Sequence, residues 1–161
     1  MSRSTTLDTW NRMASLPGGK WAFSRVLCFK APYFGSISPR FEALMPEYSK
    51  LRVRKRRAVL NHLGTVHAIA MCNMAELAGG TMTEVTVPST HRWIPKGMTV
   101  EYLKKATTDL VAVATPAEPE SQRDWVEPFE YKVKVVVRDQ QDDAVFQAMI
   151  TMWVSPKKAK V

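Results

Sequence analysis

The sequence predicts an α+β domain in which one curved antiparallel sheet wraps around a long central helix. Residues 65–83 are a nearly unbroken run of small and apolar residues, which is typical of a helix that is buried on most sides. Residues 129–138 and 144–154 alternate apolar and polar side chains around a short polar loop, which indicates a β-hairpin. Two extended segments precede the helix and four follow it, an order that favours an α+β fold.

Composition limits the class of protein. A chain of 161 residues with 45% hydrophobic and 24% charged residues is typical of one soluble globular domain. Cys28 and Cys72 form no CxxC pair and no disulfide framework, and the N-terminus carries no apolar signal segment, so we expect a cytoplasmic protein. The apolar run is interrupted by His67, Asn73 and Glu76, which excludes a transmembrane helix.

The net charge of +8 favours an anionic partner, which could be a nucleic acid, a membrane surface or a phosphate-bearing small molecule. The basic run 52–57 is interpreted as a solvated face, with contact to the phosphates of a small-molecule ligand or to nucleic acid as alternatives. No aromatic residue is interleaved with this run, so nucleic acid is not the partner that we expect. We also expect no membrane partner.

The N-terminal part, residues 1–34, is predicted to be a helical extension. Leu7, Trp10 and Met13 share one face of a helix over residues 4–16, which Pro17 and the two following glycines end. Residues 20–29 are predicted to form a second short helix. Both helices are expected to pack at the edge of the core.

The core is predicted to span residues 35–155, and residues 156–161 to form a basic tail. Its segments are assigned from alternation and from breakers such as Pro46 and Pro88. The expected strands before the hairpin are 41–45, 49–57, 98–103 and 109–115. Residues 91–96 are expected to form a loop, and residues 116–127 a polar connection.

Glu76 is the residue that most needs an explanation, because a carboxylate inside a buried helix is costly unless it is paired or protonated. No Lys or Arg lies three or four residues away along the helix. A salt bridge to another subunit is the structural alternative to catalysis. Asn61 could simply be a turn residue at the entry of the helix, and His67 a structural hydrogen-bonding residue.

Asn61, the turn 64–69 and the helical segment 75–79 together resemble the motif of PaaI-like acyl-CoA thioesterases, which have the hotdog fold. In that motif an Asn and a turn containing Gly and His precede an acid on the central helix. Residues 98–106 and the hairpin 131–154 resemble later strands of the family. This chain departs from the motif at Ala68 and Ile69, where the family has two glycines, at Glu76, where many members have Asp, and at Gly80.

The resemblance implies hydrolysis of an acyl-CoA or related thioester. Glu76 would be the general base or the nucleophile, the Ala68 backbone N–H would bind the oxyanion, and Asn61 would orient water. His67 is a further catalytic candidate. The alternative is a non-catalytic module that binds an acyl-CoA or another acyl ligand, since the side chains at Ala68 and Ile69 could crowd the carbonyl group. A dehydratase would need a different motif around its His–acid pair.

The resemblance also implies a homo-oligomer, a dimer or a dimer of dimers, with sites between subunits. No cofactor is expected apart from the CoA moiety of the substrate. No metal is expected, because His62, His67 and Glu76 lack the spacing of a zinc site. The candidate substrate-binding residues are cationic, aromatic or amide side chains near the predicted helix and strand ends: Arg92, Trp93, Lys96, Asn73, Lys104 and Lys105.

Overall fold

The computed structural model describes residues 4–118 and 125–157. The helices are α1 (Thr5–Ala14), α2 (Gly19–Lys30) and α3 (Ala68–Thr86), with the short 3₁₀ helices η1 (Pro32–Ile37) and η2 (Arg57–Val59). The strands are β1 (Arg40–Met45), β2 (Tyr48–Val53), β3 (His91–Tyr102), β4 (Leu110–Pro116), β5 (Phe129–Arg138) and β6 (Ala144–Pro156).

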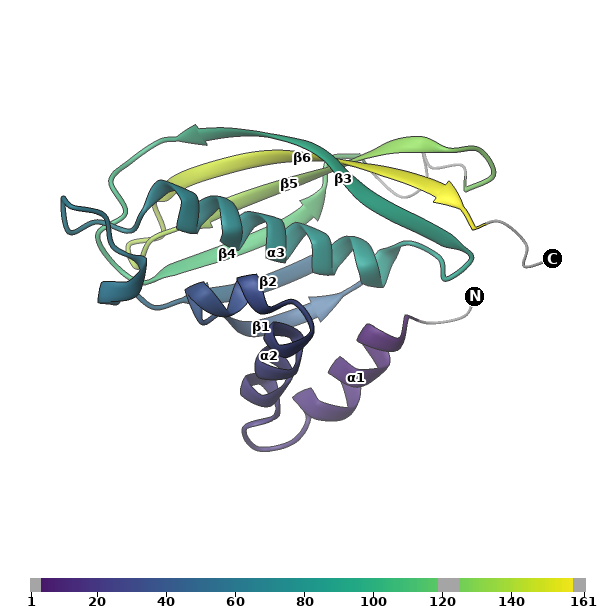
Figure 1. Cartoon of the computed structure of the whole chain (residues 1–161), viewed down its shortest axis with the longest axis horizontal. Coiled ribbons are helices and arrows are strands. Elements are labelled where there is room, and N and C mark those ends of the chain that lie inside the picture. The colour runs from purple at the N-terminus through teal and green to yellow at the C-terminus, as the bar shows by residue number, and fades with distance from the viewer. Residues whose placement is uncertain (1–3, 119–124, 158–161) are drawn as a thin grey trace.

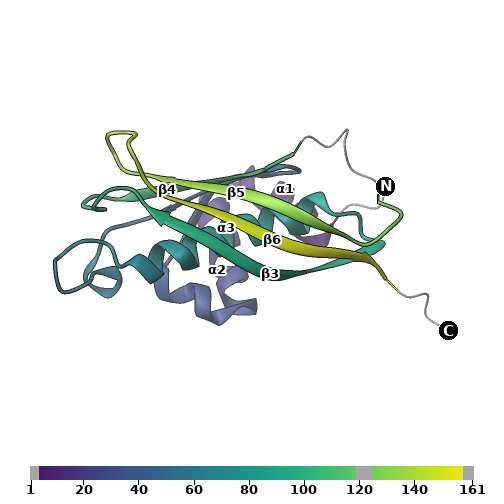
Figure 2. The same ribbon diagram turned by 90° about the horizontal axis from the view of Figure 1, so that it is seen from above.

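The six strands form one sheet in the order β1-β2-β4-β5-β6-β3, and neighbouring strands are antiparallel. The sheet curves around α3, with β1 and β3 at its two edges (Figure 1). Seen from above, β5, β6 and β3 lie over α3 (Figure 2). This is the predicted architecture.

Small residues on α3 let the helix lie close to the sheet. Ala75, Ala78 and Gly79 are buried against it. A Cβ atom on Gly79 would lie 2.8 Å from Cδ1 of Ile150 and 3.3 Å from Cγ1 of Val133, closer than normal van der Waals contact. The small-residue run that predicted a buried helix therefore determines how closely that helix packs.

The N-terminal helices share the core of the sheet. They lie beside β1 (Figure 1), and Trp10 of α1, Phe23 of α2 and Phe41 of β1 pack edge to face. The ring centroids are 5.1 Å apart for Trp10 and Phe23, 5.5 Å for Phe23 and Phe41, and 6.4 Å for Trp10 and Phe41. All three rings belong to the cluster that includes the buried face of α3.

Several predicted boundaries were wrong. The central helix begins at Ala68 and continues to Thr86, beyond the expected end at residue 83. The segment 91–96, expected to be a loop, is the first half of β3, because it pairs with the end of β6. Strand β2 ends at Val53 and not at residue 57. Part of the predicted polar connection (119–124) and most of the predicted basic tail (158–161) lie outside the described residues.

The β5–β6 turn is organised by Asp139. Its carboxylate is 2% exposed and accepts hydrogen bonds from the backbone N–H groups of Gln141 (2.9 Å) and Asp143 (3.0 Å) and from Lys104 Nζ (3.3 Å). Burial alone would raise the pKa of Asp139, but these hydrogen bonds outweigh it and hold the pKa below its usual value.

We expect Asp139 to make the free energy of unfolding of the domain decrease at acidic pH. A folded-state pKa below the unfolded value stabilises the fold above the unfolded pKa of about 4, and this contribution is lost as the pH falls through the folded-state pKa. Urea unfolding between pH 7 and pH 2 should show a shallower pH dependence in Asp139→Asn than in the parent. Asp142→Asn, at an 89% exposed side chain in the same turn, is the control. A parent-like pH dependence in Asp139→Asn would contradict the assignment.

Candidate functional site

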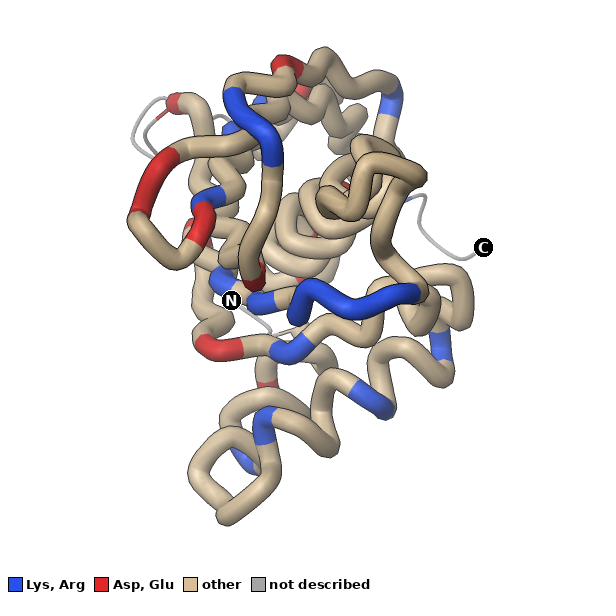
Figure 3. The backbone as a smooth tube through the Cα atoms, turned by 90° about the vertical axis from the view of Figure 1, so that its left-hand side faces the viewer, with Lys and Arg blue, Asp and Glu red and all other residues tan. Residues whose placement is uncertain are grey.

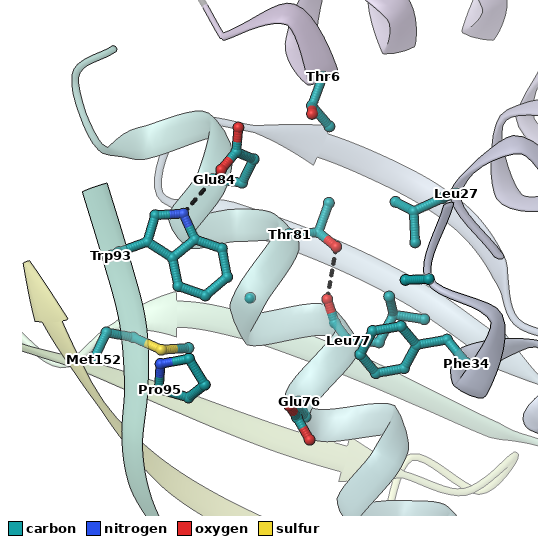
Figure 4. A pocket seen from close by; sticks show the side chains of 12 residues that line it. Thr6, Leu27, Phe34, Glu76, Leu77, Thr81, Glu84, Trp93, Pro95 and Met152 are labelled. Atoms are coloured by element: carbon teal, nitrogen blue, oxygen red, sulfur yellow. Dashed lines mark hydrogen bonds between the residues drawn. The ribbon is translucent and has the colours of Figure 1, made fainter. Parts of the chain in front are cut away.

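A cavity of about 340 Å³ lies between α3, the α2–η1 segment and β3 (Figure 4). Its walls are mostly apolar and come from Leu27, Ala31, Phe34, Leu77, Pro95 and Met152. Two carboxylates, Glu76 and Glu84, also line it, together with Thr6, Gly80, Thr81 and Trp93. The cavity therefore combines an apolar interior with acidic groups from a single helix.

Glu76 is exposed, in contrast to the buried environment that the sequence suggested. Its neighbours Ala75 and Leu77 face the core at 0% and 2% exposure, whereas Glu76 lies on the side of α3 that the sheet leaves open. Within residues 4–118 and 125–157, Glu76 has no salt bridge and no hydrogen-bonded side-chain partner. The carboxylate needs no compensating charge because water reaches it, so it can react with a bound molecule.

Glu84 is a second carboxylate of the cavity that the sequence analysis missed. Its Oε2 accepts a hydrogen bond from Trp93 Nε1 at 2.8 Å, and its Oε1 accepts one from Ser4 Oγ at 3.2 Å (Figure 4 shows the first). Glu76, Gly80 and Glu84 follow one another at intervals of four residues, which places them along one side of α3. This spacing was a usable signal, but the helix was predicted to end at residue 83.

Trp93 forms a wall of the cavity. A Cβ atom on Gly80 would lie 3.3 Å from Cη2 of the indole, so glycine leaves room for the ring against α3. The indole is half-buried and is oriented by Glu84. Trp93 is thus a candidate substrate-binding residue that the structure places in the same cavity as Glu76.

The N-terminus of α3 lies at the end of the loop that contains Asn61. His67 is the N-cap residue, and its Nδ1 accepts a hydrogen bond from the Ile69 N–H at 3.0 Å. The Ala68 N–H has no acceptor among the residues that the structure describes. Free N–H groups and the helix dipole make this end of α3 suitable for negative charge.

Asn61 organises the loop before α3. Its Oδ1 accepts hydrogen bonds from the N–H groups of Leu63 (3.0 Å) and Thr65 (3.2 Å), and its Nδ2 donates to Thr65 Oγ1 (2.9 Å). Gly64 in this loop has a φ of +75°, which a residue without Cβ adopts without strain. The amide of Asn61 is therefore used in holding the loop.

We expect Asn61→Ala to lower the free energy of unfolding by about 1 to 2 kcal/mol, because the two loop N–H groups lose their acceptor. Asn61→Asp keeps an acceptor for both groups and should recover most of this loss. Urea unfolding of the three proteins measures the effect. An Asn61→Ala protein of parent-like stability would instead leave the predicted water-orienting role as the better explanation of the residue.

Most of the other predicted substrate-binding residues have partners away from the cavity. Asn73 is buried and donates to Ser36 Oγ at 3.2 Å. Arg92 donates to Ser155 Oγ at 3.2 Å. Lys96 pairs with Glu130 and lies 5.6 Å from the centroid of the Trp153 ring. Lys104 pairs with Asp139 and Asp143, and Lys105 is exposed.

The open side of α3 borders the edge strand β3. Cys72 Sγ and Tyr102 Oη are 3.4 Å apart, and this hydrogen bond raises the pKa of the Tyr102 phenol. Ile69 of α3 is exposed, and so is Met98, which lies on the same face of β3 as Tyr102. Over the described part of the chain, no three His, Cys, Asp or Glu side chains gather as a metal site would require. None of the described helices is long and apolar enough to cross a membrane.

A family described as a domain of unknown function (DUF4442) matches residues 19–154. A crystal structure described as genomics APC5556 is 49% identical, with a TM-score of 0.80 over 94% of this chain and 98% of that one. A comparison with curated proteins finds no match.

Two more distant structures share the fold. The thioesterase HI1161 from Haemophilus influenzae is 13% identical, with a TM-score of 0.70 over 83% of this chain and 88% of that one. PA5026 from Pseudomonas aeruginosa, described as a protein of unknown function and probable thioesterase, is 23% identical, with a TM-score of 0.74 over 88% and 97%. The six-stranded sheet around α3 is therefore the hotdog fold of these structures, as predicted.

Proposed function

Since the chain belongs to the family described as DUF4442, whose domain covers residues 19–154, we propose that it hydrolyses a thioester with Glu76 as the reacting carboxylate. The observation that carries this proposal is the exposed carboxylate of Glu76, which has no salt bridge within the described residues, at an apolar cavity of about 340 Å³. The more distant relatives described as thioesterases support the reaction class, and acyl-CoA is the substrate class that we propose. The PaaI-like motif around Asn61 and Glu76 supports the same branch of the fold.

The proposed reaction needs only the substrate, water and groups of this chain. Glu76 removes a proton from water as the oxygen of that water adds to the thioester carbonyl carbon. The carbonyl oxygen becomes negative and accepts a hydrogen bond from the Ala68 N–H. The C–S bond then breaks, and the thiolate leaves with the proton, which yields a carboxylic acid and a thiol. Direct attack by Glu76, with an anhydride that water then opens, is the other course.

The spacing of the two groups supports a site that is shared between two copies of the chain. Ala68 and Glu76 are eight residues apart on α3, which is about 12 Å along the helix axis at 1.5 Å per residue. The carbon and oxygen of one carbonyl are about 1.2 Å apart. The Ala68 N–H points out of the N-terminal end of α3, away from Glu76, so a carbonyl group bound there is poorly placed for Glu76 of the same copy. Two antiparallel copies of α3 related by a two-fold axis near Cys72 would bring Ala68 of one beside Glu76 of the other.

The exposed edge of β3 supports such a pairing. Among the described residues, strand β3 pairs only with β6 and leaves its other edge open. The open face of α3 lies next to this edge. Open edges with apolar side chains favour pairing with another strand. We therefore propose a homodimer, alone or as half of a tetramer, whose interface contains β3 and α3.

Asn61 and His67 act as positioning residues in this proposal. Asn61 holds the loop that leads to Ala68, and His67 caps the helix at Ile69. The acyl group would lie against Phe34, Trp93 and Met152. Of the two predicted CoA contacts that follow β3, Lys104 is paired with Asp139 and Asp143, and Lys105 is exposed.

A panel of acyl-CoA esters with short, long and aromatic acyl groups, assayed by release of the free thiol, tests the proposal. We expect turnover of at least one ester without added metal or cofactor. If none of the esters is hydrolysed, even after long incubation, the proposed enzymatic function is wrong.

The sharing of a site between copies has its own test. Ala68→Pro removes the N–H at the first helical position, where proline is tolerated, and the extended conformation of His67 fits a following proline. Ala68→Pro and Glu76→Gln should each be inactive. When equal amounts of the two variants are unfolded and refolded together, about half of the dimers should be mixed. Each mixed dimer contains one intact site out of two, so the mixture should regain about a quarter of the parent activity. No recovery in demonstrated mixed dimers would place both groups in one copy.

A non-catalytic acyl-binding module is the second candidate. Ile69, next to the proposed oxyanion donor, is 55% exposed and bulky, so it could hold a carbonyl group away from the Ala68 N–H. Isothermal titration with an acyl-CoA distinguishes the two: tight binding without thiol release selects the module. In that case Ile69→Gly, which restores the glycine of the family motif, should introduce turnover.

A further inference from the structure

Helix α2 carries an apolar surface that the proposed site does not use. Phe29 is 88% exposed and Trp21 is 57% exposed, and Val26 on the same helix is exposed as well. Leu16 before the helix and Tyr33 after it are also exposed. Single exposed apolar residues are ordinary, but five within 18 residues of chain form a patch that favours contact with another apolar surface.

The exposed residues lie on one side of α2. At about 100° per residue, Trp21, Phe29 and Val26 cover an arc of about 140° on the helix. The opposite side, with Phe23 and Ser24, is buried against the core. Helix α2 therefore carries apolar side chains on its buried side and also on its outward side. Arg25 and Lys30 lie among the outward residues.

A dense group of cations borders this surface. Arg25, Arg40, Arg52 and Arg54 line one hollow of about 500 Å³ together with Trp21. The carboxylate in this hollow is Glu42, which is already paired with Lys50 at 3.2 Å and Arg52 at 2.9 Å. Figure 3 shows the continuous blue run that follows β2, with further blue positions on the helices below it.

We propose that this face, α2 with Arg40, Arg52 and Arg54, docks onto the surface of an anionic lipid bilayer. Aromatic and aliphatic side chains on one side of a helix insert into the boundary of headgroups and acyl chains, and neighbouring Lys and Arg bind anionic headgroups. Helix α2, with 12 residues, is too short to span a bilayer and lies in its surface. This inference goes beyond the proposed hydrolysis and revises the expectation of no membrane partner.

A second copy of the chain fits this face less well than a bilayer does. An interface with two-fold symmetry brings the same patch of both copies together, so Arg40 and Arg54 would face like charges. The proposed dimer also uses β3, at the opposite edge of the sheet from β1. The docking face therefore stays available in that dimer.

Flotation of the full chain with lipid vesicles tests the proposal. Vesicles of phosphatidylcholine alone are compared with vesicles that contain 30 mol% phosphatidylglycerol, a composition within the anionic range that such surfaces bind, at about 0.1 M and 0.5 M salt. We expect binding only to the anionic vesicles, and weaker binding at high salt. Trp21→Ser with Phe29→Ser, and separately Arg40→Glu with Arg54→Glu, should each weaken binding about tenfold or more.

Lys132→Glu with Lys134→Glu is the matched control. It changes the net charge by the same amount as Arg40→Glu with Arg54→Glu, but on β5, three strands away from β1. It should leave vesicle binding within about twofold of the parent. If the variant with both Trp21→Ser and Phe29→Ser melts at a lower temperature than the parent, Phe29→Ser alone replaces it in the test, because Phe29 is 88% exposed. No binding to anionic vesicles, or equal losses in the control and Arg40/Arg54 variants, would overturn the proposal. Tight binding of a duplex oligonucleotide would also overturn the proposal if the aromatic substitutions left this binding unchanged. That result would assign the face to nucleic acid.

Discussion

Glu76→Gln is expected to lower kcat for thioester hydrolysis about a thousandfold, with little change in KM. The amide has nearly the shape of the carboxylate but can neither take a proton from water nor attack the carbonyl carbon. Because Glu76 is exposed and has no salt bridge within the described residues, the substitution should leave the fold and the cavity intact. Steady-state rates of thiol release and a thermal melt of both proteins measure the two effects.

Glu84→Gln is the matched control on the same side of α3. The side-chain oxygen of Gln can still accept the hydrogen bond from Trp93 Nε1, so the indole should keep its place. We expect kcat within about tenfold of the parent, since Glu84 is engaged by Ser4 and Trp93 and is not free to react. A Glu76→Gln protein with more than a tenth of the parent rate would reject the proposed mechanism. A larger loss in Glu84→Gln than in Glu76→Gln would transfer the role to Glu84.

Phe41→Ala is expected to lower the free energy of unfolding by about 4 kcal/mol. Phe41 is 0% exposed and contacts the rings of Trp10 and Phe23, so its loss leaves a cavity where both N-terminal helices meet the sheet. Urea unfolding followed by tryptophan fluorescence measures this change, and Trp10 reports directly on the cluster.

Met45→Ala, on the same strand at 50% exposure, is the control and should cost less than about 1 kcal/mol. If the N-terminal helices were only an extension at the edge of the core, Phe41→Ala would unfold them separately and produce two transitions. We expect a single transition, because the three rings belong to the same buried cluster as α3.

The periodic elements could be predicted because their signals are local. Alternation in residues 129–138 and 144–154 indicated the β5–β6 hairpin, and the breakers at Pro17 and Gly18 separated α1 from α2. The first half of β3 could not be predicted in this way. Its residues are mostly exposed and contain Pro95, and they are extended because they pair with β6 about 60 residues later.

The candidate site was predictable only in part. The family motif singled out Asn61, Ala68 and Glu76, and their places at the entry, the start and the open side of α3 agree with the helix geometry. The role of Asn61 as the organiser of a loop depends on Leu63 and Thr65 folding back to it, a geometry that the spacing did not define. Glu84 was missed because the helix was predicted to end at residue 83, and because its partners, Ser4 and Trp93, are distant in sequence.

The sequence by itself determined the class of fold and the placement of one acid on a central helix, because apolar periodicity and small residues act within a few turns of chain. Only the tertiary structure decided that Glu76 is exposed beside a cavity, since the curved sheet covers α3 incompletely. It also decided that α2 presents Phe29 and Trp21 to solvent beside the arginines of β1 and β2. Burial of a side chain depends on which distant elements pack over it, and no local pattern contains that information.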